Sequence, residues 1–320
     1  MQPLLERSMN WRYKALLQLV FSNVPFGERS NYLFQRYVTR SLPTSDAKFI
    51  SIVSEAREHI EVLRKYLGRQ YEEATFYEFG AGQDLIVPLA FYALGVERQI
   101  LVDIRNLLRV ELANYTIAKF QKMSAEMGFL RKPDRFLNRK RTFLGSLKQY
   151  YGIDYRAPCD ARATALSQGS IDCITSTNTL EHIPPQDINA ILQECYRILR
   201  DDGVMSFRID YQDHYAYFDS SISVYNYLQY SNEAWSFFSP SLQYQNRLRH
   251  RDFVQIFQTA GFEIVEERCK EGTEADLKII KRLRLNKRFR QYGIEELAVR
   301  NSLIILRKRG SNSSLYSRMH

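Results

Sequence analysis

The sequence predicts an α/β protein whose core is a doubly wound, mostly parallel β-sheet. From residue 75 onward, short runs of β-branched and aromatic residues recur along the chain. Segments of about ten or more residues with apolar side chains at helical spacing separate most of these runs. A turn with two glycines follows the first run. Strands that alternate with helices of this length predict a parallel sheet covered by helices on both faces.

The strands and helices of this sheet can be assigned in chain order. In the first expected helix, Pro88 falls within the first turn or so, where its missing N–H costs least, and Gly95 ends the helix. A basic, poorly patterned stretch follows residue 123 and carries no expected element. The expected strands cover 75–79, 99–103, 153–161, 170–177, 204–210, 261–267 and 301–308, and the expected helices cover 84–94, 107–123, 187–200 and 252–260.

Residues 1–70 are expected to form an N-terminal helical extension. Apolar residues at helical spacing predict helices over 11–21 and 31–39. A third helix is expected to start after Ser45 and to stop at Gly68. The remaining expected boundaries are 71–310 for the main domain, 210–250 for an insertion within it and 311–320 for a flexible C-terminal tail.

The composition is that of a soluble globular protein with a sizeable core. Of 320 residues, 45% are hydrophobic and 25% are charged, and the formal net charge is +9. Residues 278–309 hold eleven Lys or Arg against Glu295 and Glu296, so this segment accounts for the whole excess. Such a basic run is a solvated helix face or a surface that attracts nucleic acid or anionic lipid.

The cysteines and the N-terminal stretch predict a cytoplasmic protein. The four cysteines show no paired metal-type spacing, and Cys173 and Cys195 lie in apolar or helical patterns typical of buried free thiols. The first 25 residues do not have the pattern of a signal peptide. No segment reaches the ~18 apolar residues that span a bilayer, so membrane insertion is not expected.

The stretch YEFGAGQD, residues 77–84, indicates a cofactor-binding loop. Gly80 and Gly82 stand between the first strand and the next helix, where glycine tolerates positive φ and lets a ligand approach the backbone. Asp103 ends the second strand, 21 residues beyond Gly82, at a place where a carboxylate can accept hydrogen bonds from a ribose diol. A nucleoside-containing cofactor is therefore expected.

Two departures from the dinucleotide pattern narrow the class of cofactor. Leu85 stands where a dinucleotide fingerprint carries its third glycine, which makes room for a pyrophosphate. Asp84 and Glu78 add negative charge beside the loop, which suits an ammonium group better than a phosphate. The cofactor is expected to have a ribose and a charged amino acid end, without phosphates.

Five ordered motifs then suggest a family. They are EFGAG, LVD, CDA, SIDCITSTNTLEHIPP and LRDDGVMSFRID, each at or next to an expected strand. In this order the chain resembles the class I S-adenosylmethionine-dependent methyltransferases of small-molecule type over residues 75–308. The resemblance implies a Rossmann-like seven-stranded sheet with an N-terminal helical extension and an aromatic-rich lid insertion.

The same resemblance implies roles for individual residues. Glu78, Gly80, Ala81 and Gly82, in the loop after the first strand, would flank the methionine part of the cofactor. Asp103, at the end of the second strand, would hold the ribose hydroxyls, and Asp160 and Ala161, after the third, would meet the adenine. Asn178 and Thr179, after the fourth strand, would line the methionine end.

The segment after the fifth strand is a candidate substrate lid. Residues 211–244 hold eleven aromatic residues, far above the 13% average of the chain. Aromatic faces offer flat apolar area for a sugar ring or an aromatic acceptor, although the same residues could pack a small helical cap. The polar and aromatic stretch 26–43 could complete the acceptor pocket.

Two histidines are candidate bases for a hydroxyl acceptor. Methyl transfer from a sulfonium is a direct displacement, and a hydroxyl acceptor must also lose its proton. His214 follows the fifth strand, with Asp210 and Asp213 near enough in sequence to orient it, and is preferred. His182 follows the fourth strand, next to Glu181.

No metal is expected at the site. Some quinone-type O-methyltransferases bind a divalent ion through an acidic residue three positions before a similar EH pair, but here Asn178 stands at that position. Asp210, Asp213, His214 and Asp219 form an alternative set of ligands for a hard cation.

The predicted function is transfer of a methyl group from S-adenosylmethionine to a small-molecule acceptor, at a hydroxyl of a sugar, glycan or secondary metabolite, with S-adenosylhomocysteine as product. Arg247, Arg249, His250 and Arg251 could contact an acidic substrate or form an exposed helix start. The alternatives are an RNA-modifying methyltransferase, suggested by the basic segment 278–309, and a non-catalytic binding protein of the same fold. The dinucleotide-dependent oxidoreductases are disfavoured by Leu85.

Overall fold

A computed structural model describes residues 10–138 and 143–310. The predicted flexible tail, residues 311–320, lies outside the described residues. None of the described helices combines the length and the apolar composition needed to cross a bilayer.

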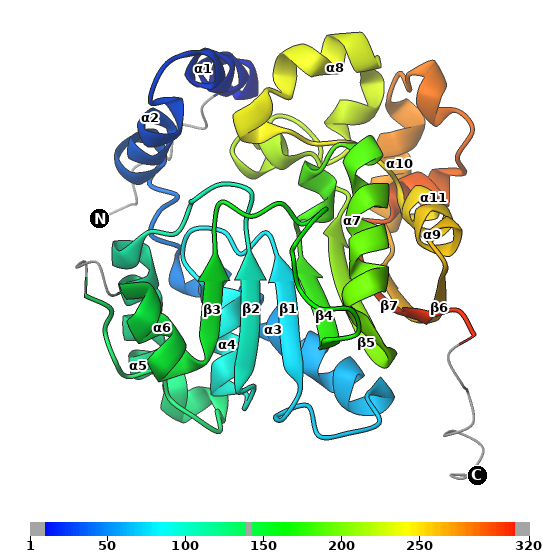
Figure 1. The fold of residues 1–320 in the computed structure, drawn as a ribbon. Coiled ribbons are helices and arrows are strands. Elements are labelled where there is room, and N and C mark those ends of the chain that lie inside the picture. The colour runs from blue at the N-terminus through cyan, green and yellow to red at the C-terminus, as the bar shows by residue number, and fades with distance from the viewer. Residues whose placement is uncertain (1–9, 139–142, 311–320) are drawn as a thin grey trace.

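The described chain forms a seven-stranded sheet in the order β3-β2-β1-β4-β5-β7-β6 (Figure 1). All neighbouring strands pair in parallel from β3 to β5, and β7 is antiparallel to both β5 and β6. This confirms the predicted mostly parallel, doubly wound sheet. The strands are β1 (Thr75–Phe79), β2 (Arg98–Val102), β3 (Ile153–Arg156), β4 (Ile171–Thr177), β5 (Leu199–Asp210), β6 (Phe262–Lys270) and β7 (Asn301–Lys308).

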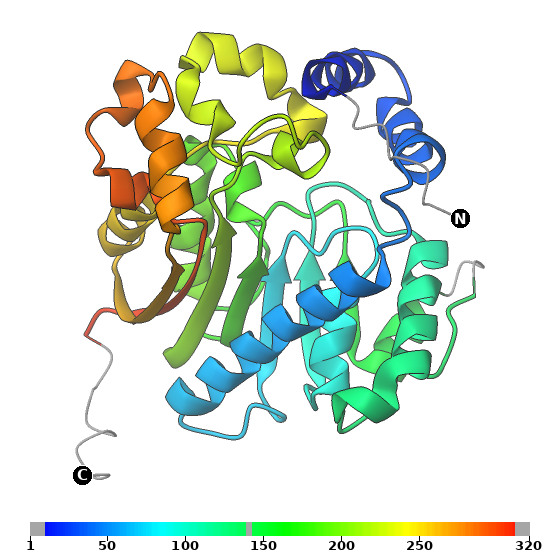
Figure 2. The same cartoon turned by 180° about the vertical axis from the view of Figure 1, so that it is seen from behind.

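Two hydrophobic clusters cover the two faces of the sheet. The first face packs against α3 (Asp46–Tyr66), α4 (Ile86–Ala93), α5 (Val110–Met127) and α6 (Phe143–Tyr151). Figure 2 shows α3 crossing this face. The opposite face packs against α7 (Pro185–Ile198) and α9 (His250–Thr259). Because side chains alternate along each strand, β1, β2, β4, β5 and β7 supply both clusters, whereas the edge strand β3 supplies only the first.

A third hydrophobic cluster forms a cap above the carboxyl ends of the strands (Figure 1). Trp11 of the first helix packs on Tyr215, Tyr230 and Phe238, with ring centroids 5.5, 5.9 and 4.7 Å apart. The N-terminal extension and the insertion after β5 are therefore joined through one aromatic core. The elements that supply it are α1 (Trp11–Asn23), η3 (His214–Tyr217), η4 (Asn226–Gln229), α8 (Asn232–Phe238), α10 (Glu274–Arg282), η6 (Lys287–Phe289) and α11 (Ile294–Ala298). Helix α1 also contacts α2 (Gly27–Leu33), which continues into η1 (Phe34–Val38), and η5 (Ser241–Gln243).

Several elements differ from the sequence-based expectation; β3, for example, ends at Arg156 and β5 already begins at Leu199. Helix α6 lies in the basic stretch that carried no predicted element, where Leu147 and Tyr151 provide a short buried face. Helix α4 begins at Ile86, because Leu85 has a left-handed backbone with φ of 56°. The helix expected over 31–39 begins at Gly27 and continues as the π-helix η1.

Arg249 joins the cap to the sheet. Its side chain is fully buried, and its guanidinium donates at 2.7 Å to each of three carbonyl oxygens. Those oxygens belong to Tyr211 after β5, Leu297 of α11 and Val299 before β7. A buried guanidinium costs desolvation energy unless its donors are paired, and here both terminal nitrogens donate to backbone carbonyl oxygens while Nε has no partner.

Replacing Arg249 with methionine is expected to lower the free energy of unfolding by about 3 kcal/mol or more, because the carbonyl oxygens of Leu297 and Val299 lose this donor and that of Tyr211 keeps only the hydroxyl of Tyr227. Urea unfolding followed by circular dichroism measures this. Arg251→Met on the same helical turn removes an exposed guanidinium and is expected to cost no more than about 0.5 kcal/mol. Equal losses in the two variants would contradict the structural role of Arg249.

Candidate active site

A pocket of about 700 Å³ opens at the carboxyl ends of the parallel strands. It lies where the strand order reverses between β1 and β4, the usual ligand site of a doubly wound sheet. The residues expected to contact the cofactor line it together with both candidate bases, whereas no residue of the stretch 26–43, which was expected to complete the acceptor pocket, does so. The expected residues that line it are Glu78, Gly80, Ala81, Gly82, Asp103, Asp160, Ala161, Asn178, Thr179, His182 and His214.

The glycine loop needs its first glycine for two independent reasons. Gly80 has φ of 79°, and its N–H donates to the carbonyl oxygen of Val102 at 2.9 Å. A Cβ at this position would lie 2.3 Å from Cγ2 of Thr179, which follows β4. The loops after β1 and β4 therefore meet at a contact that any larger residue would break.

Glu78 stands at the base of this loop as a buried carboxyl group. Its side chain is almost completely buried, and Oε2 has no hydrogen-bond partner. Burial raises the pKa of Glu78 to about 8. The group is therefore poised to ionise when a cation arrives next to it.

The residues that replace the third glycine of a dinucleotide loop anchor this loop to the protein. Asp84 accepts a hydrogen bond from the hydroxyl of Thr44 at 2.9 Å and one from the backbone N–H of Ile86 at 3.4 Å. Leu85 is completely buried in the first hydrophobic cluster. Asp84 thus caps the start of α4 and ties the loop to the segment before α3.

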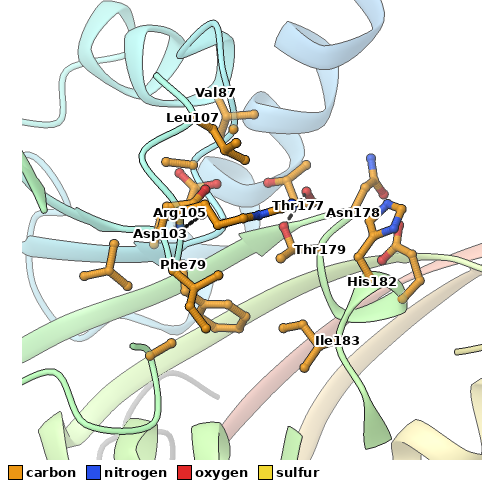
Figure 3. A pocket seen from close by; sticks show the side chains of 18 of the residues that line it. Phe79, Val87, Asp103, Arg105, Leu107, Thr177, Asn178, Thr179, His182 and Ile183 are labelled. Atoms are coloured by element: carbon orange, nitrogen blue, oxygen red, sulfur yellow. Dashed lines mark hydrogen bonds between the residues drawn. The ribbon is translucent and has the colours of Figure 1, made fainter. Parts of the chain in front are cut away.

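Asp103 follows β2 and lies on the side of the pocket away from the β4 end (Figure 3). Its side chain is 7% exposed, and Oδ1 accepts the backbone N–H of Arg105 at 3.0 Å. Burial raises the pKa of Asp103, opposed by the backbone N–H groups of Arg105 and Gly82. The turn fixes one oxygen of the carboxylate at the edge of the pocket.

Asp160 has a partner that the sequence analysis did not anticipate. Arg162 donates to both of its oxygens, with Nη2 2.7 Å from Oδ2, and also binds Asp187 at 2.7 Å. These hydrogen bonds from Arg162 lower the pKa of Asp160. The carboxylate is therefore held in place by Arg162 beside Ala161, which also lines the pocket.

Helix α3 contributes residues to the pocket beside the end of β4. Asn178 has φ of 51°, and its amide donates to Oε2 of Glu55 at 3.1 Å. Lys48 and Ile52, about two turns and about one turn before Glu55 on α3, also line the pocket. The sequence analysis missed these residues, because in an amphipathic helix pattern nothing separates a polar residue that faces a pocket from one that faces solvent.

His182 and His214 lie together at this end of the pocket, with ring centroids 4.9 Å apart. Nδ1 of His182 is 2.7 Å from the carbonyl oxygen of Tyr244. Nε2 of His214 is 3.3 Å from Oδ2 of Asp210, which also accepts the hydroxyl of Tyr217. Asp210 is thus a neighbour of His214, but Nε2 of His214 has no hydrogen-bond partner, and the orienting role of Asp210 stays a prediction.

Asp213 and Asp219, named with Asp210 and His214 as an alternative cation site, face other partners. Asp213 accepts the N–H of Tyr215 at 2.9 Å and the amide of Asn226 at 3.0 Å. Asp219 accepts the N–H of Trp11 at 2.9 Å. Both carboxylates are used inside the cap, so this alternative was wrong.

Glu181 is a site residue that the sequence analysis mentioned only as a neighbour of His182. Its side chain is 2% exposed, and neither carboxylate oxygen has a hydrogen-bond partner. Burial raises the pKa of Glu181 well above its usual range, and the nearby charge of Asp210 adds to this. Ligand atoms of Glu181, His182 and His214 all lie within 4.8 Å of one another.

The aromatic lid mostly forms the core of the cap. Of the eleven aromatic residues in 211–244, Tyr217 is the one that lines the pocket within the described chain, and Leu242 joins it from the same segment. Tyr215, Tyr225 and Trp235 are buried in the third hydrophobic cluster. The expectation that this segment presents many aromatic faces to an acceptor is therefore corrected.

The predicted acidic-substrate contacts at the start of α9 are likewise structural. Arg247 is buried, and it donates to the carbonyl oxygens of Tyr227 and Tyr230 at 3.0 and 2.8 Å. Arg249 holds the cap to the sheet, as described above. Neither guanidinium lines the pocket.

Comparison with known proteins agrees with this architecture. A family model described as a methyltransferase domain matches residues 53–267. No curated protein sequence matches the chain. Solved structures that resemble it include an S-adenosylmethionine-dependent methyltransferase from Methanosarcina mazei, at 14% identity and a TM-score of 0.45, covering 77% of this chain and 96% of that one.

Two further structures carry ligands. The 1,6-didemethyltoxoflavin N1-methyltransferase of Burkholderia thailandensis, with 1,6-didemethyltoxoflavin and S-adenosylhomocysteine bound, has 14% identity and a TM-score of 0.44, covering 96% of this chain and 92% of that one. The geranyl diphosphate C-methyltransferase of Streptomyces coelicolor has 12% identity and a TM-score of 0.43, with coverages of 84% and 86%. The residues that match the family model include every strand that ends at the pocket, so this chain belongs to that family and is an S-adenosylmethionine-dependent methyltransferase.

Proposed function

We propose that this methyltransferase acts on a hydroxyl oxygen of a small molecule, such as a sugar, glycan or secondary metabolite. The observation that carries this proposal is the pair of imidazoles, His182 and His214, at the β4 and β5 end of the pocket. A hydroxyl is a poor nucleophile until its proton is removed, and imidazole groups near the reacting oxygen serve that step.

The charge of the pocket supports an acceptor without phosphate or carboxylate groups. Eight carboxyl groups line it, against the cations Lys48, Arg105 and Arg162. An acidic pocket favours the sulfonium and ammonium groups of the cofactor and repels the phosphates of RNA. The carboxyl groups are Glu55, Glu78, Asp84, Asp103, Asp160, Glu181, Asp187 and Asp210.

We propose that the remaining residues have the roles that the family resemblance implies, and their places around the pocket support this. Asp103 holds the ribose hydroxyls, and Asp160 and Ala161 meet the adenine. The loop from Glu78 to Gly82 flanks the methionine part, and Asn178 and Thr179 line it from the opposite side. The cofactor supplies the methyl group, and its binding in this orientation brings the sulfonium end toward His182 and His214.

The histidine pair is arranged to manage the acceptor proton. A carbonyl oxygen only accepts hydrogen bonds, so Nδ1 of His182 carries its proton toward Tyr244 and leaves Nε2 with a lone pair. Asp210, whose Oδ2 lies 3.3 Å from Nε2 of His214, is the group placed to orient that imidazole. We also propose that the enzyme works in the cytoplasm, which is supported by the free thiols of Cys173 and Cys195.

Asp103→Asn is expected to weaken S-adenosylhomocysteine binding by about 10- to 100-fold, because the ribose hydroxyls lose a charged acceptor worth about 1.5–3 kcal/mol. Isothermal titration calorimetry measures the dissociation constant. Asp154→Asn, on the neighbouring strand and outside the pocket, is the matched control and is expected to bind as the unchanged protein does. An unaltered affinity in Asp103→Asn would contradict the proposal that Asp103 binds the ribose hydroxyls.

Binding of S-adenosylmethionine is expected to tighten as the pH rises through about 8, with release of a proton. Glu78 is protonated below its raised pKa in the free enzyme, and the bound cation favours its ionised form. Calorimetry in two buffers with different heats of ionisation counts the proton. Glu78→Gln isolates this group from the titration of the ligand's own amine, and the same proton release in that variant would contradict the assignment.

His214→Ala is expected to lower kcat by about 10²- to 10⁴-fold, while the affinity for S-adenosylhomocysteine stays unchanged. The acceptor is first found by incubating the enzyme and S-adenosylmethionine with neutral sugars and phenols, and looking for products heavier by one CH₂ group. His250→Ala, a histidine outside the pocket, is the control. Methylation confined to nitrogen or carbon atoms would overturn the proposal of a hydroxyl acceptor.

A further inference from the structure

We propose that Glu181, His182 and His214 form a binding site for a divalent transition-metal ion at the acceptor end of the pocket. Binding of the ion is independent of the acceptor's identity, whereas its use in catalysis rests on the proposed methylation of a hydroxyl. With the ion bound, the two histidines would act as metal ligands, and the ion would hold the acceptor oxygen. Neither imidazole would then take the acceptor proton directly.

The three side chains come from two adjacent strand ends. Glu181 and His182 lie on η2 (Leu180–His182), which follows β4, and His214 begins η3 after β5. Their ligand atoms lie within 4.8 Å of one another. Bonds of about 2.0–2.2 Å to a central ion require separations of about 3–4 Å, so modest side-chain rotations would close the site.

The carboxyl group of Glu181 has no other partner to explain its position. It is 2% exposed and turned into a pocket, and neither oxygen is hydrogen-bonded. No Lys or Arg among the described residues forms an ion pair with it, and the nearby charge of Asp210 is also negative. Buried carboxylates are normally paired or coordinate metals. A divalent cation between Glu181 and the imidazoles would supply that pairing.

A backbone hydrogen bond holds the imidazole of His182 in the form that a metal ion binds. Nδ1–H of His182 is directed at the carbonyl oxygen of Tyr244, which leaves Nε2 free to bind an ion. A ring N–H given to a backbone carbonyl is the usual support of a metal-bound histidine. Asp210, which lies 3.3 Å from His214, is itself fixed by the backbone N–H of Gln212 at 3.0 Å.

The ligand set selects the type of ion. Two imidazoles and one carboxylate suit Zn²⁺, Co²⁺, Ni²⁺ or Mn²⁺ better than Mg²⁺ or Ca²⁺, which prefer oxygen ligands. An ion held by three protein ligands would keep one coordination position for the acceptor hydroxyl. The charge of the ion would lower the pKa of that hydroxyl. The hydroxyl proton would pass to Asp210, the oxygen lone pair would form the O–CH₃ bond, and the electron pair of the S–CH₃ bond would stay on sulfur.

The test uses the full chain without a histidine tag, stripped of metal with EDTA. Co²⁺ is titrated in and its visible absorption is recorded, because the band positions report nitrogen ligands and coordination number, and calorimetry with Zn²⁺ gives the stoichiometry. Glu181→Gln keeps the shape of the side chain, and His182→Ala removes a second ligand. His250→Ala is the control, and S-adenosylhomocysteine binding reports whether each variant is folded.

The expected result is one bound ion per chain in the unchanged protein and in His250→Ala. In Glu181→Gln and His182→Ala the affinity should fall by more than the ~10–100-fold that loss of a second-shell partner costs. Absence of a bound ion in a protein that binds S-adenosylhomocysteine would overturn the metal site, and so would binding that neither variant changes. Because no acceptor is present in these titrations, failure to methylate a hydroxyl is read separately and bears only on the proposed function.

Discussion

The reversal of strand order between β1 and β4 is the constraint on which the rest of this structure depends. From that pair the chain builds outward to β2 and β3 on one side and to β5 on the other, so the connections after β1 and β4 diverge and leave a pocket between them. The contact between Gly80 and Thr179 sets how close those two connections come. Each functional group lies at a strand end because only there does the sheet leave an opening.

The pocket is acidic although the protein as a whole is basic. The formal net charge of +9 comes from residues 278–309, in the cap and in β7, whereas carboxyl groups dominate the pocket lining. Burial raises the pKa of both Glu78 and Glu181, so part of this negative charge develops only when a cation is present. The carboxyl groups of the pocket can therefore ionise when a cationic ligand binds. The basic segment 278–309 does not change this local charge, because it lies outside the pocket.

Local patterns predicted the sheet well and the cap poorly. The strand TFYEF coincides with β1, and Ser45 caps α3 as expected, because alternation and capping are properties of neighbouring residues. The positions of Asp103, Asn178 and His214 could be predicted because parallel strands end at one edge. The burial of Arg249 and the unpaired, buried carboxyl group of Glu181 could not be predicted from local patterns. Both depend on segments that are far apart in sequence and meet only in the folded chain.

The aromatic core of the cap has a consequence for acceptor choice. Trp11, Tyr215 and Trp235 pack tightly enough to join the N-terminal helix to the insertion after β5, and Arg249 fastens the insertion to β5 and β7. These aromatic side chains are buried in the core of the cap and do not line the pocket, so they do not reach an acceptor bound there. Acceptor shape is then left to the few cap and α3 side chains that reach the pocket, namely Lys48, Ile52, Glu55, Tyr217 and Leu242. A fold can host different activities through the side chains of its site, and in this chain those five residues are the part of the pocket that the cap and α3 contribute.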